Sequence, residues 1–471
     1  MKPIFAIAVG VIAIVTVLVG TLRWKESERV AMIVETNLLA PPSAMGLHPE
    51  LARRIKELNQ RIVDNPNAID SLGKLSRLYH ANGYLNDAWQ AYRILIEVDG
   101  ENPLWHHRLA SIVSSYGQLE DALALYVKAS ELDPSYLPTR LHLGDAYLKL
   151  NKDKEAESVF ESILKEAPKN AFALFGLARV SLARSDQAQA KTFLESARRS
   201  NSRIGGDLLA DLYEELGETA KARSLLHEVN WSSHVDVYDP WVDDLVSDCY
   251  DSFEVAMAGG KAGRAGDTDK AIRLLKRATT LDPLDQNALN HLAENYLTRG
   301  DIEQARETYD RCTKIAPTFW EGWSGLISIE VNAGNHAQAS EIIDQALVHC
   351  PNSYVINNYK GDALITENRA REAIPYFEKT IQLVPENAVG YNYLARAYVS
   401  LGQSAKAHEQ LQKALKAEPS NPLALKLISL YYIVEGEKAN AEEHMDRAYR
   451  SPRFSEEDLQ RLQAMFNQRF Q

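Results

Sequence analysis

The sequence predicts an all-α solenoid in which short pairs of helices stack on one another. Two regularities in the 471 residues support this prediction. A proline returns every 34 residues through the C-terminal half, and a small residue returns with the same step in both halves. The prolines are Pro283, Pro317, Pro351, Pro385 and Pro419, and the small residues run from Ala88 to Ala190 and from Ala271 to Ala441. Such a period indicates one unit repeated along the chain, each copy burying its apolar face against the next.

The most regular copy, at 388–421, shows what this unit contains. Apolar side chains such as Tyr391 and Tyr398 recur at a spacing that places them on one face of a helix. Gly402 marks a turn, and a second amphipathic stretch then continues until Pro419. Each copy is therefore expected to be a helix–turn–helix pair.

This pattern resembles the tetratricopeptide repeat, which has a period of 34 residues with small, aromatic and proline positions in this order. The copies at 286–318 and 137–170 match at nearly every signature position. Their signature residues are Leu289, Leu292, Ala293, Tyr296, Gly300, Ala305, Tyr309, Cys312 and Pro317, and Leu143, Gly144, Tyr147, Ala156, Phe160 and Pro168. The resemblance implies a right-handed superhelix whose first helices line a concave groove that binds partner peptides.

The N-terminus carries an uncharged run at 4–22, IFAIAVGVIAIVTVLVGTL. As a helix rising about 1.5 Å per residue, it would span roughly 28 Å, close to the thickness of the hydrocarbon core. We expect a transmembrane signal anchor at 1–22. A cleaved signal peptide is the alternative, but the run is longer than a usual signal core and no A-x-A site follows it. The flanking Lys and Arg nearly balance, and large domains translocate largely regardless of charge, which favours repeats on the periplasmic side.

The remaining segments follow in order, with about five repeats in the first array and about six in the second. They are a juxtamembrane linker at 23–47 that begins as a helix and continues as a Pro-bounded stretch, a capping half-repeat helix at 48–68, a first array at 69–234, an insert at 235–251, a second array at 252–455 and a C-terminal capping helix at 456–471. The copies are expected to begin at Ile69, Pro103, Leu137, Ala171 and Arg203, and then at Ser252, Gln286, Trp320, Tyr354, Ala388 and Pro422.

The insert, VDVYDPWVDDLVSDCYD, is the longest break in the pattern, and it contains aspartates but no Lys or Arg. One interpretation is an acidic, aromatic recognition element, or a site for a hard cation that prefers carboxylate oxygens. Its candidate residues are Asp239, Trp241, Asp243 and Asp244. The other interpretation is an irregular helical linker. In that case Trp241, Leu245 and Tyr250 would pack between the arrays while the aspartates face water.

Composition and motifs exclude several classes of function. The net charge of −12 argues against a nucleic-acid surface, which needs a basic stripe. Three cysteines are too few and too scattered for a disulfide framework or a zinc site. We find no phosphate-binding loop, nucleophile elbow, H-E-x-x-H or haem-attachment motif. The sequence therefore predicts no cofactor, no resident metal and no catalytic activity.

The expected function is non-catalytic protein binding. By the resemblance, groove positions in the first array include Arg77, His107, Asp145 and Arg179. Those in the second array are Asn290, Glu294, Ser324, Asn358, Asp362, Asn392 and Arg396, with Trp320, Tyr354 and Tyr393 as an aromatic patch that faces a partner. We expect a membrane-anchored scaffold or adaptor of bacterial cell-envelope assembly that captures peptides or helices. Two alternatives are a cytoplasm-facing scaffold that recruits soluble enzymes, and an enzyme-associated module with a metal or active site at the insert.

Overall fold

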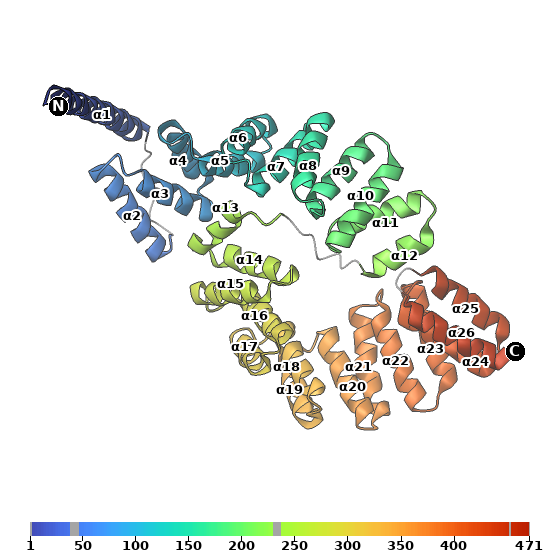
Figure 1. Ribbon diagram of the computed structural model, residues 1–471. Coiled ribbons are helices and arrows are strands. Elements are labelled where there is room, and N and C mark those ends of the chain that lie inside the picture. The colour runs from blue at the N-terminus through green and yellow to red at the C-terminus, as the bar shows by residue number, and fades with distance from the viewer. Residues whose placement is uncertain (1, 38–46, 229–236, 452–453, 471) are drawn as a thin grey trace. The chain divides into compact units, whose positions relative to one another are not determined.

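The computed structural model describes residues 2–37, 47–228, 237–451 and 454–470, and every regular element in these ranges is helical. The helices form two compact units (Figure 1). The first unit contains 1–205 and 235–255, and the second contains 206–234 and 256–471. This division differs from the two arrays expected from the sequence. The fifth helical pair groups with the second unit, and the insert groups with the first.

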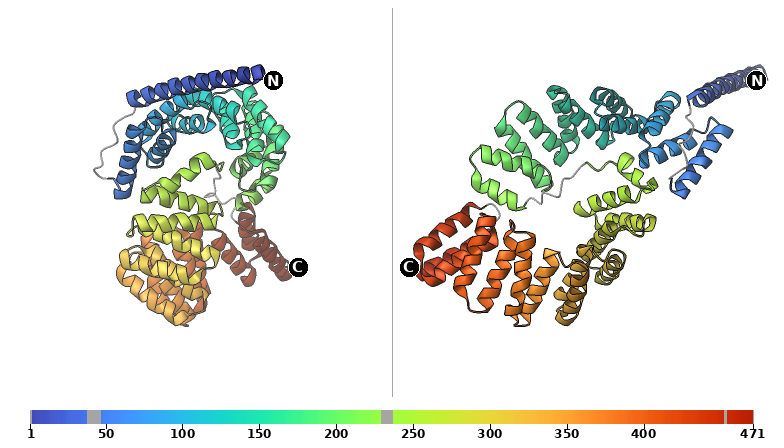
Figure 2. Two further views of the ribbon diagram at one scale, coloured as in Figure 1. Left: turned by 60° about the vertical axis from the view of Figure 1, so that its left-hand side comes forward. Right: turned by 180° about the vertical axis from the view of Figure 1, so that it is seen from behind.

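The first unit is a row of helical pairs. Its elements are α1 (Lys2–Asn37), α2 (Pro49–Asp64), α3 (Ile69–Ala81), α4 (Leu85–Val98), α5 (Pro103–Ser115), α6 (Leu119–Leu132), α7 (Leu137–Lys149), α8 (Asp153–Glu166), α9 (Ala171–Ala183), α10 (Gln187–Ser200), α13 (Pro240–Asp243) and the 3₁₀-helix η1 (Asp244–Asp248). From α3 to α10 each helix packs against the next, and Figure 2 shows the row from two further directions. The first helices of these four pairs begin at the residues where the sequence places the copies.

Close packing between successive pairs depends on glycine. Phe160 of α8 is buried between α7 and α9. A Cβ atom added to Gly144 would lie 2.6 Å from the Phe160 ring, and one added to Gly176 would lie 2.4 Å from it. The ring thus occupies the space that a methyl group at either position would need, which explains the small residue at this signature position of α7.

Helix α1 continues past the segment predicted to be an anchor. Its last turns bury Val30, Ile33 and Val34 in the same core cluster as residues of α4. The juxtamembrane segment at 23–47, which is predicted to begin as a helix, is helical up to Asn37, and 38–46 lie outside the described residues. No helix within the described part of the chain is long and apolar enough to cross a membrane. Most of the predicted anchor falls on residues of α1 whose side chains are not described, so the anchor gains no support and stays a prediction.

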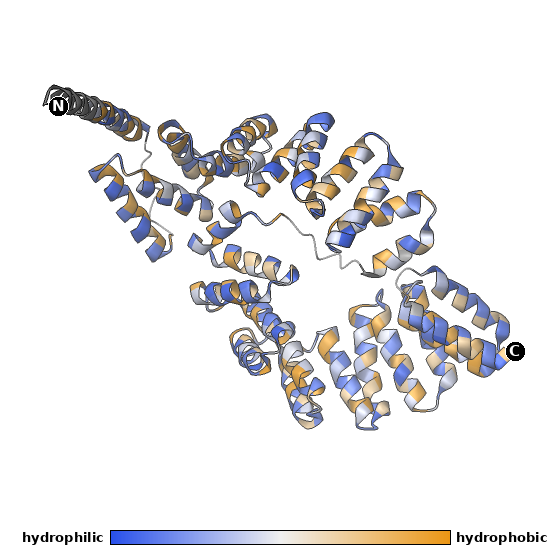
Figure 3. Ribbon diagram, viewed as in Figure 1, coloured by the Kyte–Doolittle hydropathy of each residue, from blue (hydrophilic) through white to orange (hydrophobic). Residues whose placement is uncertain are grey.

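The second unit repeats the same helical pair. Its elements are α11 (Gly206–Glu215), α12 (Thr219–Glu228), α14 (Ser252–Arg264, whose first residues count with the first unit), α15 (Thr268–Leu281), α16 (Gln286–Arg299), α17 (Ile302–Ile315), α18 (Trp320–Asn332), α19 (His336–His349), α20 (Tyr354–Thr366), α21 (Ala370–Leu383), α22 (Ala388–Ser400), α23 (Ser404–Ala417), α24 (Pro422–Glu435), α25 (Lys438–Arg450) and α26 (Glu456–Phe470). Hydrophobic and hydrophilic residues are interspersed along these helices, as expected for amphipathic helices with one buried face (Figure 3).

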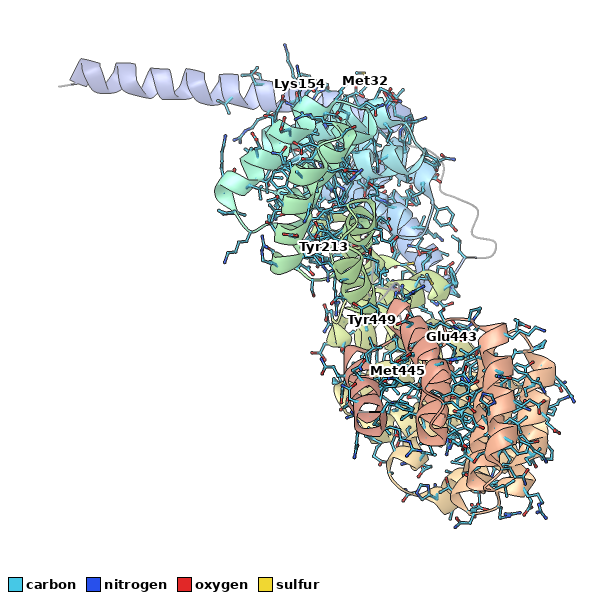
Figure 4. The ribbon with its side chains drawn as sticks, turned by 90° about the vertical axis from the view of Figure 1, so that its right-hand side faces the viewer. Met32, Lys154, Tyr213, Glu443, Met445 and Tyr449 are labelled. Atoms are coloured by element: carbon cyan, nitrogen blue, oxygen red, sulfur yellow. The ribbon has the colours of Figure 1, made fainter. Side chains whose placement is uncertain are left out.

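The second unit begins with α11 and ends with α26. Helix α11 begins at Gly206 rather than at the expected Arg203, because the turn before it includes Gly205 in the left-handed region, with φ at +68°. At the other end, α26 buries Leu462 in the cluster that contains Ile428 of α24. Met445 of α25 packs against the same cluster (Figure 4).

Candidate functional site

The insert lies on one face of the first unit. Helix α13 packs against α5, and η1 packs against α3 (Figure 1). We call residues 237–250 the insert segment, and we call the surface that receives it, formed by α3, α5 and α7 with Arg54 of α2, the N-terminal groove. Residues 235 and 236 of the predicted insert lie outside the described part.

The carboxylate of Asp239 is the most enclosed acidic group of the insert segment, with 3% of the residue exposed. Its Oδ2 atom lies 2.6 Å from Nε2 of His107 and 3.2 Å from Nε2 of His142. Its Oδ1 atom accepts a hydrogen bond of 2.6 Å from the hydroxyl of Tyr136. Donors from α5, from α7 and from the residue before α7 therefore meet at one carboxylate.

The electrostatics fix the protonation of this pair. Burial lowers the pKa of His107 and outweighs the neighbouring carboxylate, so the imidazole is neutral at neutral pH. Its Nδ1 atom lies 2.7 Å from the hydroxyl of Thr139, which can donate or accept, whereas the ionised Asp239 can only accept, so Nε2 carries the proton. Burial alone would raise the pKa of Asp239, but the bonds from His107, His142 and Tyr136 hold it well below its usual range. The site is a buried carboxylate facing a neutral histidine.

Trp241 provides the aromatic part of the contact. Its ring stacks on Tyr136, with centroids 3.5 Å apart and planes within 9°. It meets His107 edge to face at 5.3 Å. Its backbone oxygen accepts a hydrogen bond of 2.8 Å from Nε of Arg108. A carboxylate and an aromatic ring, two residues apart in the insert segment, are thus received together by the groove.

A second acidic contact holds the other end of the insert segment. The Asp248 carboxylate pairs with Arg77 of α3 and, at 2.9 Å, with Arg54 of α2. Arg77 also donates to the backbone oxygen of Asp244 at 3.1 Å. The amide of Asn82 brackets the next residues, donating to the backbone oxygen of Asp248 and accepting from the backbone N–H of Tyr250.

The cluster around Asp239 has the composition of a metal site. Ligand atoms of His107, His142 and Asp239 all lie within 4.8 Å of one another. No local sequence pattern indicates this grouping, because the three residues stand far apart in the chain. A metal here would have to displace the hydrogen between Nε2 of His107 and the Asp239 carboxylate, which lie 2.6 Å apart. The contacts fit a hydrogen-bonded cluster, and the aspartate already accepts from the groove with both oxygens.

The expected solvent-facing linker is wrong in its main feature. Asp239 is buried, and the Asp248 side chain is only 19% exposed, so these two aspartates do not face water. The other two candidates make local contacts. Asp243 accepts from the backbone N–H of Asp239 at 2.7 Å, and the exposed Asp244 accepts from the hydroxyl of Tyr238 at 3.0 Å. Of the other two residues expected to fill the space between the arrays, Leu245 is buried and Tyr250 packs against the core cluster of the first unit.

In the first unit, the resemblance placed four residues in the groove. Arg77 and His107 bind the insert segment, as described. Asp145 of α7 pairs instead with Arg179 of α9 at 2.6 Å, which links two successive first helices.

In the second unit, the polar candidates contact neighbouring side chains. Three of them are buried asparagines. Asn290 donates to Glu294 at 2.9 Å, Asn358 accepts from Thr380 at 2.8 Å, and Asn392 donates to Asn421 at 3.1 Å.

Two of the three charged candidates, Asp362 and Arg396, pair at 2.6 Å and keep 37% and 47% of their side chains exposed. Ser324 lies 3.4 Å from the hydroxyl of Tyr359.

The aromatic candidates of the second unit are half-buried. Trp320 packs against the core cluster of α18 to α20, and Tyr393 stacks on Phe377 with centroids 5.3 Å apart. Tyr354 is half-buried at the start of α20. These rings share their surface between the repeats and solvent, so their role in partner binding stays a prediction.

Comparison with known proteins agrees with the repeat architecture. The profile of the tetratricopeptide repeat family matches residues 115–173, 264–319 and 364–431. DnaJ homolog subfamily C member 3 of Gallus gallus is 26% identical over 235 residues, which cover 50% of this chain and 40% of that protein. The TPR repeat-containing protein YpiA of Bacillus subtilis (strain 168) is 23% identical over 245 residues, covering 51% and 54%. The chain thus spans about half, or less, of the length of these curated relatives.

Among solved structures, yeast Tom70 is 15% identical, with a TM-score of 0.40, over 85% of this chain and 96% of that one. The matched segments and the helical pairs together show that the chain contains tetratricopeptide repeats at 115–173, 264–319 and 364–431.

Proposed function

We propose that the chain is a non-catalytic protein-binding scaffold that captures partner peptides or helices in grooves lined by its first helices. One observation carries this proposal. The N-terminal groove holds a segment with little regular structure through the side chains of Asp239, Trp241 and Asp248. Peptide recognition uses the same combination of a few buried anchors and exposed residues between them.

The second unit offers a further surface for a partner. Glu294 of α16 and Arg396 of α22 are exposed charged residues on first helices. Burial raises the pKa of Asp362 against the opposing effect of Arg396, so the carboxylate in this pair is poorly solvated. A carboxylate of a partner protein that pairs with Arg396 would therefore compete with the Asp362 carboxylate for this arginine.

Partner capture with surface variants tests this proposal. The full chain carrying both Glu294→Ala and Arg396→Ala is compared with the wild-type chain and with Lys413→Ala, which changes an exposed residue of the second helix α23. We expect proteins captured by the wild type to be lost only with the double variant. Equal capture by all three chains, with unchanged helical content, would place partner binding elsewhere and overturn this part of the proposal.

Membrane attachment is the second part of the proposal, and it rests on the uncharged run at 4–22. An anchor would raise the local concentration of the scaffold near partners of a bacterial cell envelope. We expect the full chain to remain with membranes after a carbonate wash and a chain without residues 1–22 to be released. Release of both would contradict the anchor.

The side of the membrane is tested separately. Lys314 is highly exposed, and the native cysteines at 249, 312 and 350 are buried, so Lys314→Cys adds a single accessible thiol. We expect an impermeant thiol reagent to label this variant from the periplasmic side of intact cells. Labelling only after lysis would favour the cytoplasm-facing scaffold.

A further inference from the structure

The insert segment contacts the N-terminal groove as a bound peptide would. Its buried or stacked anchors are Asp239, Trp241 and Asp248, while Tyr238 just before them and Asp244 between the last two are exposed. Its only regular structure is the four residues of α13 and the five of η1. A segment of this kind is held by its anchors rather than by a helical interface of its own.

The groove is built to hold a carboxylate. His107 is fully buried, and its Nε2–H points at the Asp239 carboxylate, which also receives the Tyr136 hydroxyl. Without a carboxylate these buried donors would lose their acceptor, and a buried donor left unsatisfied is destabilising. The ring of Tyr136 next to them gives an aromatic side chain a face to stack on. The groove thus selects an acid followed closely by an aromatic ring.

Charge complementarity points the same way. Arg54, Arg77 and Arg108 from three helices of the groove all donate to the insert segment. The insert carries aspartates and no Lys or Arg. Opposite charges arranged like this set the register of an acidic ligand and disfavour a basic one.

We propose that the N-terminal groove is a recognition site for an acidic, tryptophan-bearing peptide of a partner protein, and that the insert segment occupies this site in cis until the partner displaces it. The partner peptide carries a carboxylate and an aromatic ring two residues apart, as Asp239 and Trp241 do, with a second acid further along. The inference rests on the proposed scaffold function and specifies the ligand of one groove.

Because the insert segment occupies the N-terminal groove of its own chain, a partner peptide must compete with it for the groove. A tethered segment competes at an effective concentration in the millimolar range for short flexible linkers. The wild-type groove therefore binds a free peptide of the same chemistry weakly, and removal of the anchors from the insert segment frees it.

A synthetic peptide with the sequence of 237–251, VYDPWVDDLVSDCYD, labelled with a fluorophore and carrying Cys249→Ser, tests this by fluorescence anisotropy. The proteins are the wild-type full chain, the double variant Asp239→Ala with Trp241→Ala, and the control Asp244→Asn. We expect the double variant to bind at least about tenfold more tightly than the wild type and the control to match the wild type. The same peptide with Asp239→Asn and Trp241→Ala should not bind the freed groove.

Three results would overturn the inference. They are a folded double variant that binds no better than wild type, peptide binding that ignores the two anchor changes in the peptide, and a concentration-dependent dimer that exchanges inserts between copies. If the double variant does not fold, Trp241→Ala alone is used, with the same expectation. Because partner capture by the second unit is measured with Glu294 and Arg396 variants, failure of the groove inference is distinguishable from failure of the scaffold function.

Discussion

At the scale of single residues, the buried Asp239 carboxylate determines how the insert segment is held. It accepts from His107 and Tyr136 and also from the backbone N–H of Trp241, so its charge is met by donors on both sides of the contact. Hydrogen bonds to a charged group contribute about 1.5–3 kcal/mol to stability, more than neutral ones. The other aspartates of the insert segment are more exposed.

Replacing Asp239 by Asn tests this difference. The asparagine side chain has no charge, and its NH₂ group would face the donors of His107 and Tyr136. We therefore expect the free energy of unfolding of the first unit to fall by about 1.5–3 kcal/mol. Urea denaturation followed by circular dichroism measures the change. The exposed Asp244 provides the matched control, because Asp244→Asn should stay within about 0.5 kcal/mol of the wild type. Equal effects of the two substitutions would contradict the anchoring role.

The pH dependence of stability tests the state of His107. Its folded pKa lies below the ordinary value of about 6.5, so the unfolded chain takes up a proton first as the pH falls. The groups facing it are Asp239, His142, Arg108 and Tyr126. Its contribution is present above about pH 6.5 and is lost progressively below it. Asp239 has a lowered pKa, and its contribution is lost only in stronger acid.

We therefore expect the unfolding free energy of the wild type to decline between pH 7 and pH 5. The variant His107→Gln, which keeps a donor for Asp239, should decline less steeply over this interval. Identical slopes for the two proteins would show that His107 does not titrate as the structure implies.

Zinc addition tests the reading of His107, His142 and Asp239 as a hydrogen-bonded cluster. A ligand that binds only the folded state raises the melting temperature. Because His107 donates through Nε2, we expect neither zinc nor a chelator to shift the melting temperature of the chain. A zinc-dependent rise that disappears in His142→Ala would identify a metal site and revive the alternative of a metal-bearing insert.

At the scale of elements, the repeats could be predicted and the docking of the insert could not. Helices begin at residues such as Ile69 and Gln286 because a period of 34 residues fixes both the turns and the buried faces. The contact between His107 and Asp239 joins residues 132 positions apart, and no local pattern encodes it. Charge is the sequence feature that could have indicated the docking of the insert. The insert lacks basic residues, while the repeat resemblance places Arg77 and His107 in the groove.

The packing of a single pair offers a test at this scale. Gly144→Ala forces a methyl group against the Phe160 ring, which Gly176 also confines, so we expect a loss of about 1–3 kcal/mol in unfolding free energy. Gly260→Ala is the matched control in helix α14, where the nearest atom to the added Cβ is the end of Arg264 at 3.4 Å. The control should be neutral or slightly stabilising, since alanine favours helix over glycine. A neutral Gly144→Ala would show that the ring can move aside.

At the scale of the whole molecule, the two compact units do not coincide with the two arrays of repeats predicted from the sequence. The sequence places the break at the insert, because the phase is lost there. Spatial contacts assign the insert to the first unit and the preceding pair, α11 and α12, to the second. The loss of the 34-residue phase therefore marks a place where the chain passes from one unit to the other. Periodicity alone does not show to which unit each segment belongs.

The central claim is that the insert segment occupies the N-terminal groove through the pair formed by His107 and Asp239. A double-mutant cycle with His107→Gln, Asp239→Asn and both together measures their coupling in the free energy of unfolding. Residues in direct contact couple by about 0.5–3 kcal/mol, whereas distant residues add within about 0.3–0.5 kcal/mol. We predict a coupling of at least about 1 kcal/mol. Additive effects of the two substitutions would contradict the claim, because they would mean that the two side chains do not meet in the folded protein.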